Sequence, residues 1–329
     1  MNRSHSLVFV PAFFLLVLLP PPVAVSGSAT KKALSPGVLN RTNPNQTTAM
    51  TDTNTQKKSH GRVVQLKSKP RPEHFAFNVA DPAAVAQWYC DHLAMKVVRK
   101  SPPPSNTHFI GDSTGNMLLE LYQNASAPIL RYDSLSHMAL HLAFMVDDVK
   151  AIRDSLVGAG AKLVEDTVIT TGDQVLILRD PWGLAIQFVK RISPMLKPTG
   201  IRPEHVALNV PDPQRMAKWY VKNLGMKVVR KGTPPRYATF VADAGNNMMM
   251  ELYHNTSYPM LDLPSIHHLS FHFAFTVSDV QAIRDRLVAA GAKLVEDIRV
   301  SNSGDQILML RDPWAVPIQF IKRAEPMLK

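Results

Sequence analysis

The chain has 329 residues, of which 45% are hydrophobic and 19% charged, a composition typical of a soluble globular protein long enough for two domains. Its formal charge is +11, but residues 1–71 hold ten Lys and Arg against one acid, Asp52. Residues 72–329 keep 27 basic and 25 acidic side chains, a net of only +2. A nucleic-acid-binding face requires basic residues on the folded part, so the charge distribution argues against a nucleic-acid partner.

The first 29 residues have the three regions of a secretory signal: a basic start, an apolar run, and then prolines and small residues. The apolar run has thirteen residues, whereas a bilayer-spanning helix needs about 20. We therefore expect a signal peptide over 1–29, cleaved after Ser26 or Ala29, and a secreted or periplasmic protein without stable membrane insertion. The alternative is translation from Met50, which would give a cytosolic product.

Residues 30–71 are rich in Thr, Asn, Gln, Ser and Lys and have almost no periodic apolar positions. Such a segment buries too little surface to offset the entropy lost on ordering. The composition predicts a disordered polar and basic linker ahead of the folded part.

The first folded element is an alternating strand over 74–79, with one apolar set of side chains and a second set that begins with His74. Asp81 and Pro82 then provide a helix N-cap and a first-turn proline. Apolar positions at helical spacing follow: Val85, Trp88, Tyr89 and Leu93. Cys90, the only cysteine, lies in this predicted helix, which indicates a buried small side chain rather than a nucleophile.

Three short runs of β-forming residues follow the helix, at 95–100, 107–112 and 116–122, each bounded by Gly, Pro, Asn or Asp. The unit thus reads strand–helix–strand–strand–strand. Its helix is expected to cover the apolar face of a curved sheet and to leave the face that carries the histidine free.

The opening octet HFAFNVAD at 74–81 recurs as HLAFMVDD at 141–148, HVALNVPD at 205–212 and HFAFTVSD at 272–279. A repeat of 131 residues makes 72–191 and 203–323 two copies of one domain, with a linker over 192–202 and a tail over 324–329. A shorter repeat of 67 residues divides each domain into two modules. We number the four modules 1 to 4 in chain order.

Each module ends in an apolar strand that carries one Glu or Gln, 46 or 47 residues after the histidine. These residues are Glu120, Gln187, Glu251 and Gln319. A glutamate inside an apolar strand is costly unless it is paired or bound to a metal, so the repeated pair predicts metal coordination. The small alanine two residues after each histidine is expected to keep the face open beside the ligand.

The motifs EHxAxNVxDP, MELY, HxAFxVxD and RDPWGLAIQF are similar to those of the vicinal oxygen chelate superfamily, which includes glyoxalase I, bleomycin-resistance proteins, methylmalonyl-CoA epimerase and extradiol dioxygenases. The resemblance covers nearly all of 72–323. It implies an α+β fold of two tandem domains, in which paired βαβββ modules form a cupped mixed sheet with helices outside. It also implies one divalent ion per site, Zn, Ni, Co, Mn or Fe(II), held by the first-strand His and the last-strand Glu or Gln of two modules.

The resemblance leaves two ways of pairing the modules. Pairing within domains gives the ligand sets His74, Glu120, His141, Gln187 and His205, Glu251, His272, Gln319. Pairing across domains instead joins His74 and Glu120 to His272 and Gln319. Both pairings give two imidazoles, one carboxylate and one amide at each site.

Other residues near these motifs have candidate roles beside those of the ligands. Four are expected to line the substrate pocket: Asn78, Tyr122, Asn209 and Tyr253. Two histidines lie four residues before a candidate ligand and could support it or simply end a strand: His137 and His268. Two arginines could hold a substrate anion or be exposed strand ends: Arg99 and Arg230. Two aspartates read as turn formers: Asp180 and Asp312.

The expected substrate is a small molecule that chelates the ion through adjacent oxygens, and no oligomer is required. In glyoxalase I the last strand of the second module carries a glutamate that binds metal and moves the proton; here the residues are Gln187 and Gln319. An amide can coordinate through oxygen but takes no proton near pH 7, so Glu120 and Glu251 are the candidate catalytic bases of a lyase or isomerase. We expect weak or absent glyoxalase I turnover. Extradiol dioxygenase chemistry and a bleomycin-resistance-type binding protein without catalysis are the alternatives.

Overall fold

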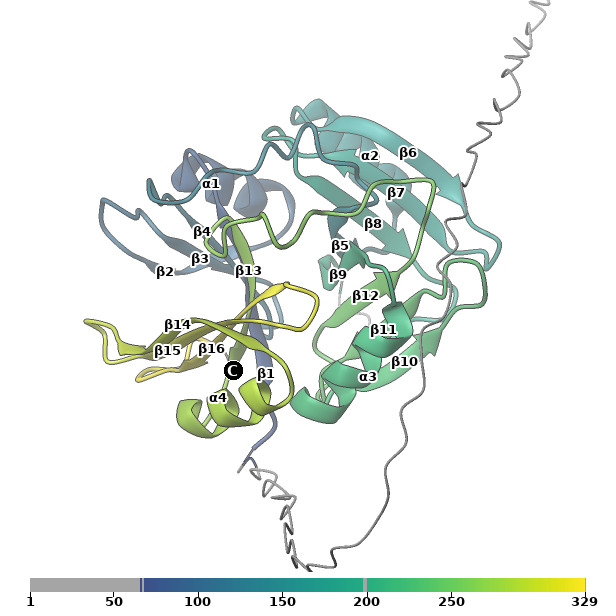
Figure 1. Cartoon of the computed structure of the whole chain (residues 1–329). Helices are drawn as coiled ribbons and strands as arrows, with labels where there is room; N and C mark the ends of the chain where they lie inside the picture. Colours follow the sequence, from purple (N-terminus) through teal and green to yellow (C-terminus); the bar gives the residue numbers. More distant parts are fainter. Residues whose placement is uncertain (1–65, 67, 198–199, 329) are drawn as a thin grey trace, which may run out of the picture. The chain divides into compact units, whose positions relative to one another are not determined.

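The computed structural model describes residues 66, 68–197 and 200–328, so the predicted signal peptide and most of the predicted linker lie outside the described residues. Within them the chain repeats one strand–helix–three-strand unit four times, as the sequence predicts (Figure 1). None of the helices in this part of the chain is long and apolar enough to cross a membrane.

The modules agree closely in the lengths of their elements. Module 1 comprises β1 (Arg71–Asn78), α1 (Pro82–His92), β2 (Lys96–Lys100), β3 (His108–Gly111) and β4 (Leu118–Tyr122). Module 2 comprises β5 (Leu140–Met145), α2 (Val149–Gly158), β6 (Lys162–Val168), β7 (Gln174–Arg179) and β8 (Ala185–Lys190). Module 3 comprises β9 (Arg202–Asn209), α3 (Pro213–Leu224), β10 (Lys227–Lys231), β11 (Thr239–Ala242) and β12 (Met249–Tyr253). Module 4 comprises β13 (Phe271–Thr276), α4 (Val280–Ala289), β14 (Lys293–Val300), β15 (Gln306–Arg311) and β16 (Pro317–Lys322).

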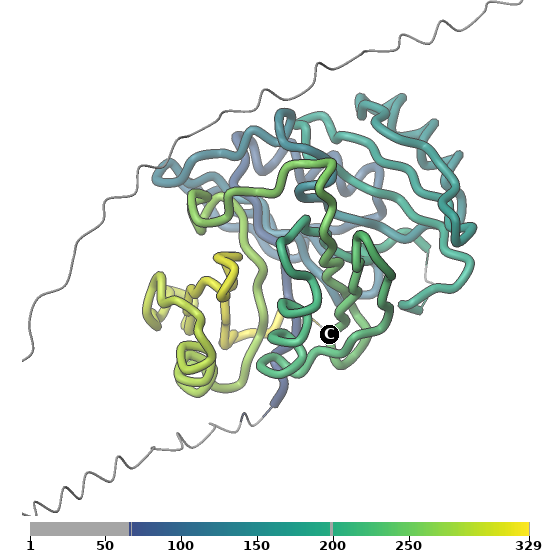
Figure 2. Tube along the Cα trace, turned by 45° about the vertical axis from the view of Figure 1, so that its right-hand side comes forward, coloured from purple at the N-terminus to yellow at the C-terminus, as the bar shows by residue number. Residues whose placement is uncertain are grey.

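The modules pair across the two sequence repeats. One eight-stranded sheet has the order β14-β15-β16-β13-β1-β4-β3-β2 and combines modules 4 and 1, while the other has the order β10-β11-β12-β9-β5-β8-β7-β6 and combines modules 3 and 2. The first strand of the fold, in purple, therefore lies beside the yellow-green strand β13 of the last module (Figures 1 and 2). Of the two pairings that the sequence left open, the structure contains the one that crosses the repeats.

The last residue of each octet caps the helix that follows. The side chains of Asp81, Asp148, Asp212 and Asp279 each accept a hydrogen bond from a backbone N–H three residues later, at 2.9–3.0 Å. This satisfies one of the free N–H groups at a helix start. The octet thus begins with the candidate ligand and ends with the helix cap, which fixes the distance between the two along the chain.

The helices join modules that the sheets keep apart. The Trp88 indole on α1 donates to the carbonyl of Ala159 behind α2 over 3.0 Å, and the Tyr89 hydroxyl donates to Asp180 over 3.0 Å. Modules 3 and 4 repeat both contacts. The predicted helical stripe is confirmed, since Val85, Tyr89 and Leu93 are buried in the core and Trp88 packs against it. Asp180 does form the predicted turn, and it also accepts this buried hydrogen bond.

Candidate metal centres

Strand register brings the four module motifs together in two places. In the antiparallel pair β1–β13, His74 lies opposite Ala274 and Ala76 lies opposite His272. The pair β5–β9 repeats this register, so each histidine faces an alanine of the neighbouring module. In the flanking parallel pairs, Glu120, Gln187, Glu251 and Gln319 each align with one of these alanines. The small alanines leave room for four polar side chains on one face of each sheet, as predicted.

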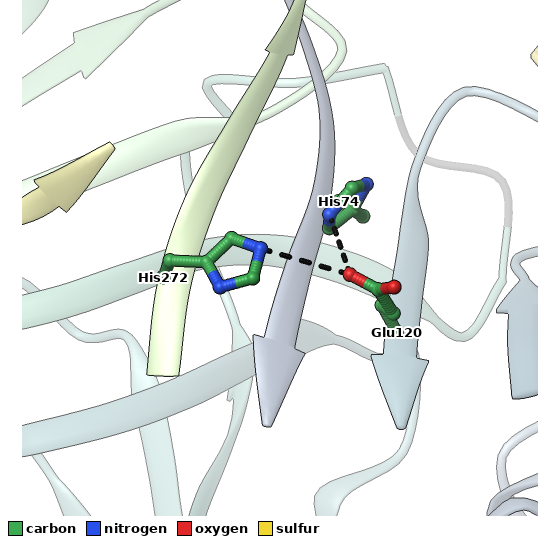
Figure 3. A group of neighbouring side chains, drawn as sticks. All are labelled: His74, Glu120 and His272. Atoms are coloured by element: carbon green, nitrogen blue, oxygen red, sulfur yellow. Dashed lines mark ion pairs between the residues drawn. The ribbon is translucent and has the colours of Figure 1, made fainter. Parts of the chain in front are cut away.

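We define site 1 as the set formed at the centre of the first sheet: His74, Glu120, His272 and Gln319. Figure 3 shows its three titratable side chains converging from β1, β4 and β13. The Glu120 Oε2 atom lies 3.0 Å from His74 Nε2 and 3.6 Å from His272 Nε2. The Gln319 side chain is buried on β16, the neighbour of β13.

We define site 2 as the equivalent set of the second sheet: His205, Glu251, His141 and Gln187. The Glu251 Oε2 atom lies 3.1 Å from His205 Nε2, and one ligand atom from each of His141, His205 and Glu251 lies within 4.8 Å of the others. The Gln187 side chain lines the same cavity as His141 and Glu251. The structure therefore does not bring His74 together with His141, as pairing within domains would have required.

The donor atoms of both sites fit a bound divalent ion. The Nε2 atoms of His74, His141, His205 and His272 are all buried. Those of His74 and His205 contact only the carboxylate of their own site, and those of His141 and His272 have no hydrogen-bond partner among the described residues. A buried polar atom without a partner is costly, so one at the equivalent position of each site requires an explanation. At both sites one atom from each of the two histidines and the carboxylate lies within 4.8 Å of the others, a span that one ion can bridge. Imidazole, carboxylate and amide oxygen suit Zn, Ni, Co, Mn or Fe(II).

Each site has a second carboxylate that the sequence analysis did not identify. The Nδ1 atom of His74 donates to Glu73 over 2.9 Å, and that of His205 donates to Glu204 over 2.8 Å. These bonds leave the Nε2 lone pair free for a metal, because the proton of the neutral ring stays on Nδ1. Arg323 holds Glu73 with two nitrogens, its Nη2 at 2.6 Å.

Site 2 repeats this arrangement with Arg191 and Glu204, at 2.6 and 2.7 Å. The sequence did contain a signal for these residues. The dipeptide Glu–His occurs only in modules 1 and 3, and Lys–Arg at the end of the last strand occurs only in modules 2 and 4. This alternation indicates that odd modules pair with even ones.

The two histidines of each site differ in pKa because their electrostatic environments differ. Burial lowers the pKa of His272 to about 3 and that of His141 to about 4, so both rings are neutral at pH 7. Burial also acts on His74, but the carboxylates of Glu120 and Glu73 outweigh it and raise the pKa of His74. Burial opposes ionisation of Glu120 as well, yet the nearby imidazoles hold its pKa below the usual value. Each carboxylate is therefore ionised and available to a cation.

The comparison with known proteins agrees with this fold and its repeats. The sequence model described as Glyoxalase/Bleomycin resistance protein/Dioxygenase superfamily matches residues 71–188 and 202–320. The chain belongs to this superfamily.

Similar proteins within the superfamily include plant enzymes. A lactoylglutathione lyase from Oryza sativa subsp. japonica is 27% identical over 205 residues, which cover 57% of this chain and 67% of the relative. Lactoylglutathione lyase GLX1 of Arabidopsis thaliana is 26% identical over 204 residues, which cover 57% of this chain and 68% of the relative. The crystal structure of glyoxalase I from Zea mays has a TM-score of 0.61 at 22% identity, with coverage of 77% of this chain and 92% of that one. This last likeness shows a shared fold.

A cavity lies next to the carboxylate of each site. The site-1 cavity, of about 450 Å³, is lined by Glu120, Arg99 and Arg323 among others. The site-2 cavity, of about 350 Å³, is lined by Glu251, Arg230 and Arg191 among others. Arg99 and Arg230 thus line the cavities, but both are also engaged within the protein, with Asp305 and Asp173 respectively.

The prediction that Asn78 and Asn209 line the pocket needs correction. The Asn78 amide donates to the carbonyls of Asn124 and Ala127, and its oxygen accepts from the Asn124 N–H. Asn209 makes the equivalent bonds. Both side chains are buried and hold the loop after the last strand of their module, so their polar atoms are not available to a ligand.

The two candidate tyrosines and the two histidines upstream of candidate ligands differ in their positions and contacts. Tyr253 lines the site-2 cavity, and its hydroxyl donates to the Met138 carbonyl. Tyr122 lies beside the His272 ring, and its hydroxyl donates to the Leu269 carbonyl over 2.5 Å. The His137 carbonyl accepts from His141 Nδ1 over 2.9 Å, so this residue supports the ligand through its backbone. The His268 ring instead pairs with Glu296. Neither upstream ring belongs to a ligand cluster of the described residues.

Proposed function

We propose that the protein is a metal-dependent lyase or isomerase of the glyoxalase type, acting on a small substrate that presents two adjacent oxygens. The observation that carries this proposal is the set of four buried Nε2 atoms, two at each site, which face one carboxylate beneath a cavity and make no hydrogen bond to any other described group. The names of the plant relatives support the reaction class. A bound divalent ion would act as a Lewis acid that polarises the substrate oxygens.

The protein's own residues would orient the substrate and move a proton. Glu120 and Glu251 are the only carboxylates in their ligand clusters, so each is the candidate base for a carbon-bound proton next to the substrate carbonyl. Their lowered pKa values keep them ionised at neutral pH but also make them weak bases. Gln187 and Gln319 can only offer an amide oxygen. We therefore propose that turnover of the glutathione–methylglyoxal adduct is weak and that another vicinal-oxygen compound is the preferred substrate.

The donor set also fits a second candidate function, that of an extradiol dioxygenase. Two imidazoles and one carboxylate are the ligands of non-haem Fe(II) oxygenases, and both sites contain this set. An extradiol dioxygenase would cleave a catechol only with Fe(II) and oxygen, whereas a lyase would work with a redox-inactive ion such as Zn²⁺.

The experiment follows from this difference. Metal-stripped full chain is loaded in parallel with Zn²⁺, Ni²⁺, Mn²⁺ and Fe²⁺ and assayed for turnover of a panel of compounds with adjacent carbonyl and hydroxyl oxygens, the glutathione–methylglyoxal adduct among them, and for oxygen uptake with catechol. Lyase turnover with a redox-inactive ion supports the proposal, and oxygen uptake confined to the Fe²⁺ form supports the dioxygenase. Ligand binding without turnover in any form would favour a binding protein.

We also propose that the protein is exported, on the basis of the basic, apolar and small-residue regions of residues 1–29. Mass spectrometry of the native protein should find its N-terminus near Gly27 or Thr30. A native N-terminus at Met50, or an intact Met1 in the cytosol, would refute export.

A further inference from the structure

The two cavities differ at equivalent positions of the repeat. Arg236 and Tyr258 line the site-2 cavity, whereas the residues 131 positions earlier are Ser105 and Ala127. The metal ligands, by contrast, are of the same residue types in both sites. The chain has therefore kept the candidate metal chemistry and changed what surrounds the substrate.

Among the arginines of the site-2 cavity, Arg236 differs from Arg191 and Arg230 in its contacts. Arg191 is held by Glu204 and Asp173, and Arg230 by Asp173 and the Ser193 carbonyl. The Arg236 guanidinium has no hydrogen bond or ion pair with any residue that the structure describes. Its side chain is exposed, so it can move to meet a ligand that enters the cavity.

The remaining walls of the two cavities also differ in polarity. Phe240, Tyr253 and Tyr258 contribute aromatic rings to the site-2 cavity, and aliphatic side chains add to them: Ile169, Val175, Ile177 and Val189. The site-1 cavity has a hydroxyl-rich wall instead, from Ser101, Thr107, Ser301 and Ser303, and its exposed cation is Lys100 on β2 rather than an arginine at the position of Arg236. An apolar wall favours an apolar ligand body, because the apolar surfaces of both the wall and the ligand are removed from water on binding.

We propose that site 2 takes a substrate with an apolar body and a terminal anionic group that Arg236 binds, while site 1 takes a substrate with a more polar body. The inference rests on the proposed function, since it assumes that the other end of the substrate chelates the ion held by His141, His205 and Glu251. The planar guanidinium fork of an arginine matches a carboxylate with two parallel hydrogen bonds. Arg236 would thus set the substrate preference of one of the two sites.

The test uses two hydroxamate probes, which chelate through adjacent oxygens: benzohydroxamate and 4-carboxybenzohydroxamate. The full chain carries His74→Ala to leave site 2 alone or His205→Ala to leave site 1 alone, and is loaded with Zn²⁺. Calorimetric titration then gives the Kd of each probe. Arg236→Ser is introduced into the first background and Ser105→Arg into the second, each being the residue found at the equivalent position of the other repeat. Urea unfolding confirms that every variant is folded.

Site 2 should bind the carboxylated probe roughly tenfold more tightly than the plain one, as expected for a charge-assisted hydrogen bond at an exposed position. Arg236→Ser should abolish this preference without changing the Kd of the plain probe, and Arg236→Lys should keep part of it. In site 1, Ser105→Arg should tighten binding of the carboxylated probe and leave the Kd of the plain probe unchanged. An unchanged preference in Arg236→Ser, or equal affinities at site 2, would overturn the inference alone. Failure of both probes to bind the Zn²⁺-loaded wild type would overturn the proposed function as well.

Discussion

Glu73 and Arg323 lie 250 residues apart in the sequence and form a buried salt bridge, with Nη2 2.6 Å from Oε2. Glu73 precedes His74, the candidate ligand of module 1, and Arg323 follows the last strand of module 4. The bridge therefore orients His74 only when the two ends of the folded chain are paired. Arg191 and Glu204 form the same link at site 2, but only 13 residues apart. Both sites thus depend on a contact between an odd and an even module.

This relationship predicts the effect of neutralising Glu73. Glu73→Gln keeps an acceptor for His74 Nδ1 but removes the charge that holds Arg323. Metal affinity at site 1 should fall by about 10–100-fold, the usual effect of losing an outer partner of a metal-bound histidine. The measurement is calorimetric titration of the metal-stripped protein with Zn²⁺, in the His205→Ala background that leaves only site 1. Glu204→Gln in the same His205→Ala background leaves site 1 untouched, should bind Zn²⁺ as tightly as its parent, and is the matched control. If Glu73→Gln bound Zn²⁺ as tightly as its parent, Glu73 would have no positioning role.

The two repeats offer an internal test of backbone strain. Gly225 ends α3 in the left-handed conformation with φ 67°, and the equivalent residue after α1 is Ala94, with φ 53°. A β-carbon is unfavourable in this conformation, so Ala94→Gly should stabilise the protein by about 0.5–1 kcal/mol. Ala315, with φ 69°, corresponds to Gly183 and should respond in the same way. Urea-unfolding midpoints measure the change. Gly225→Ala should lower the midpoint, and a higher midpoint in that variant would contradict the explanation.

Asp312 predicts a pH dependence of stability. Burial raises its pKa from 3.8 to about 7, although the Val316 N–H and the Tyr220 hydroxyl favour the charged form. Between these values the folded state binds a proton that the unfolded state lacks, so stability should fall as pH rises from about 4 to 7 and then level off. The contribution is at most about 4 kcal/mol. Asp312→Asn should flatten this slope in urea-unfolding curves of the metal-stripped protein at pH 4.5, 6 and 7.5. A variant with the slope of the wild type would show that Asp312 is not its source.

The glutamines predict a gain of function. If the missing carboxylates limit turnover of the glutathione–methylglyoxal adduct, Gln187→Glu together with Gln319→Glu should increase that turnover, since a general base typically contributes 10²–10⁴-fold. The initial rate of lactoylglutathione formation by the metal-loaded protein measures the gain. Asn variants at both positions keep an amide and serve as the control. Robust activity of the unmodified protein, equal to that of the Glu variant, would show that glutamine is no impediment.

Much of this structure could be predicted from the sequence because the four copies of one module reinforce each other. Alternation around His74 and Glu120 gave the correct faces, and Asp81 correctly marked a helix start. The pairing of modules could not be decided from the two ligand sets, since both contain the same residue types. Asn78 was misassigned because alternation gives the direction of a side chain but not its partners, which here belong to a loop 46 residues away. Glu73 was missed because strict alternation places it on the apolar face of β1, whereas the strand register shifts between Pro72 and His74 and the Glu73 side chain contacts His74 and Arg323.

The number of metal ions bound per chain tests the central claim most directly. Elemental analysis of the purified, metal-loaded full chain should find two divalent ions in the wild type and one in either His74→Ala or His205→Ala. The double variant should bind almost none while keeping the circular dichroism of the folded protein. His92→Ala, which changes a histidine at the end of α1 outside both clusters, should retain two ions. A folded double variant that still held two ions would contradict the assignment of both sites.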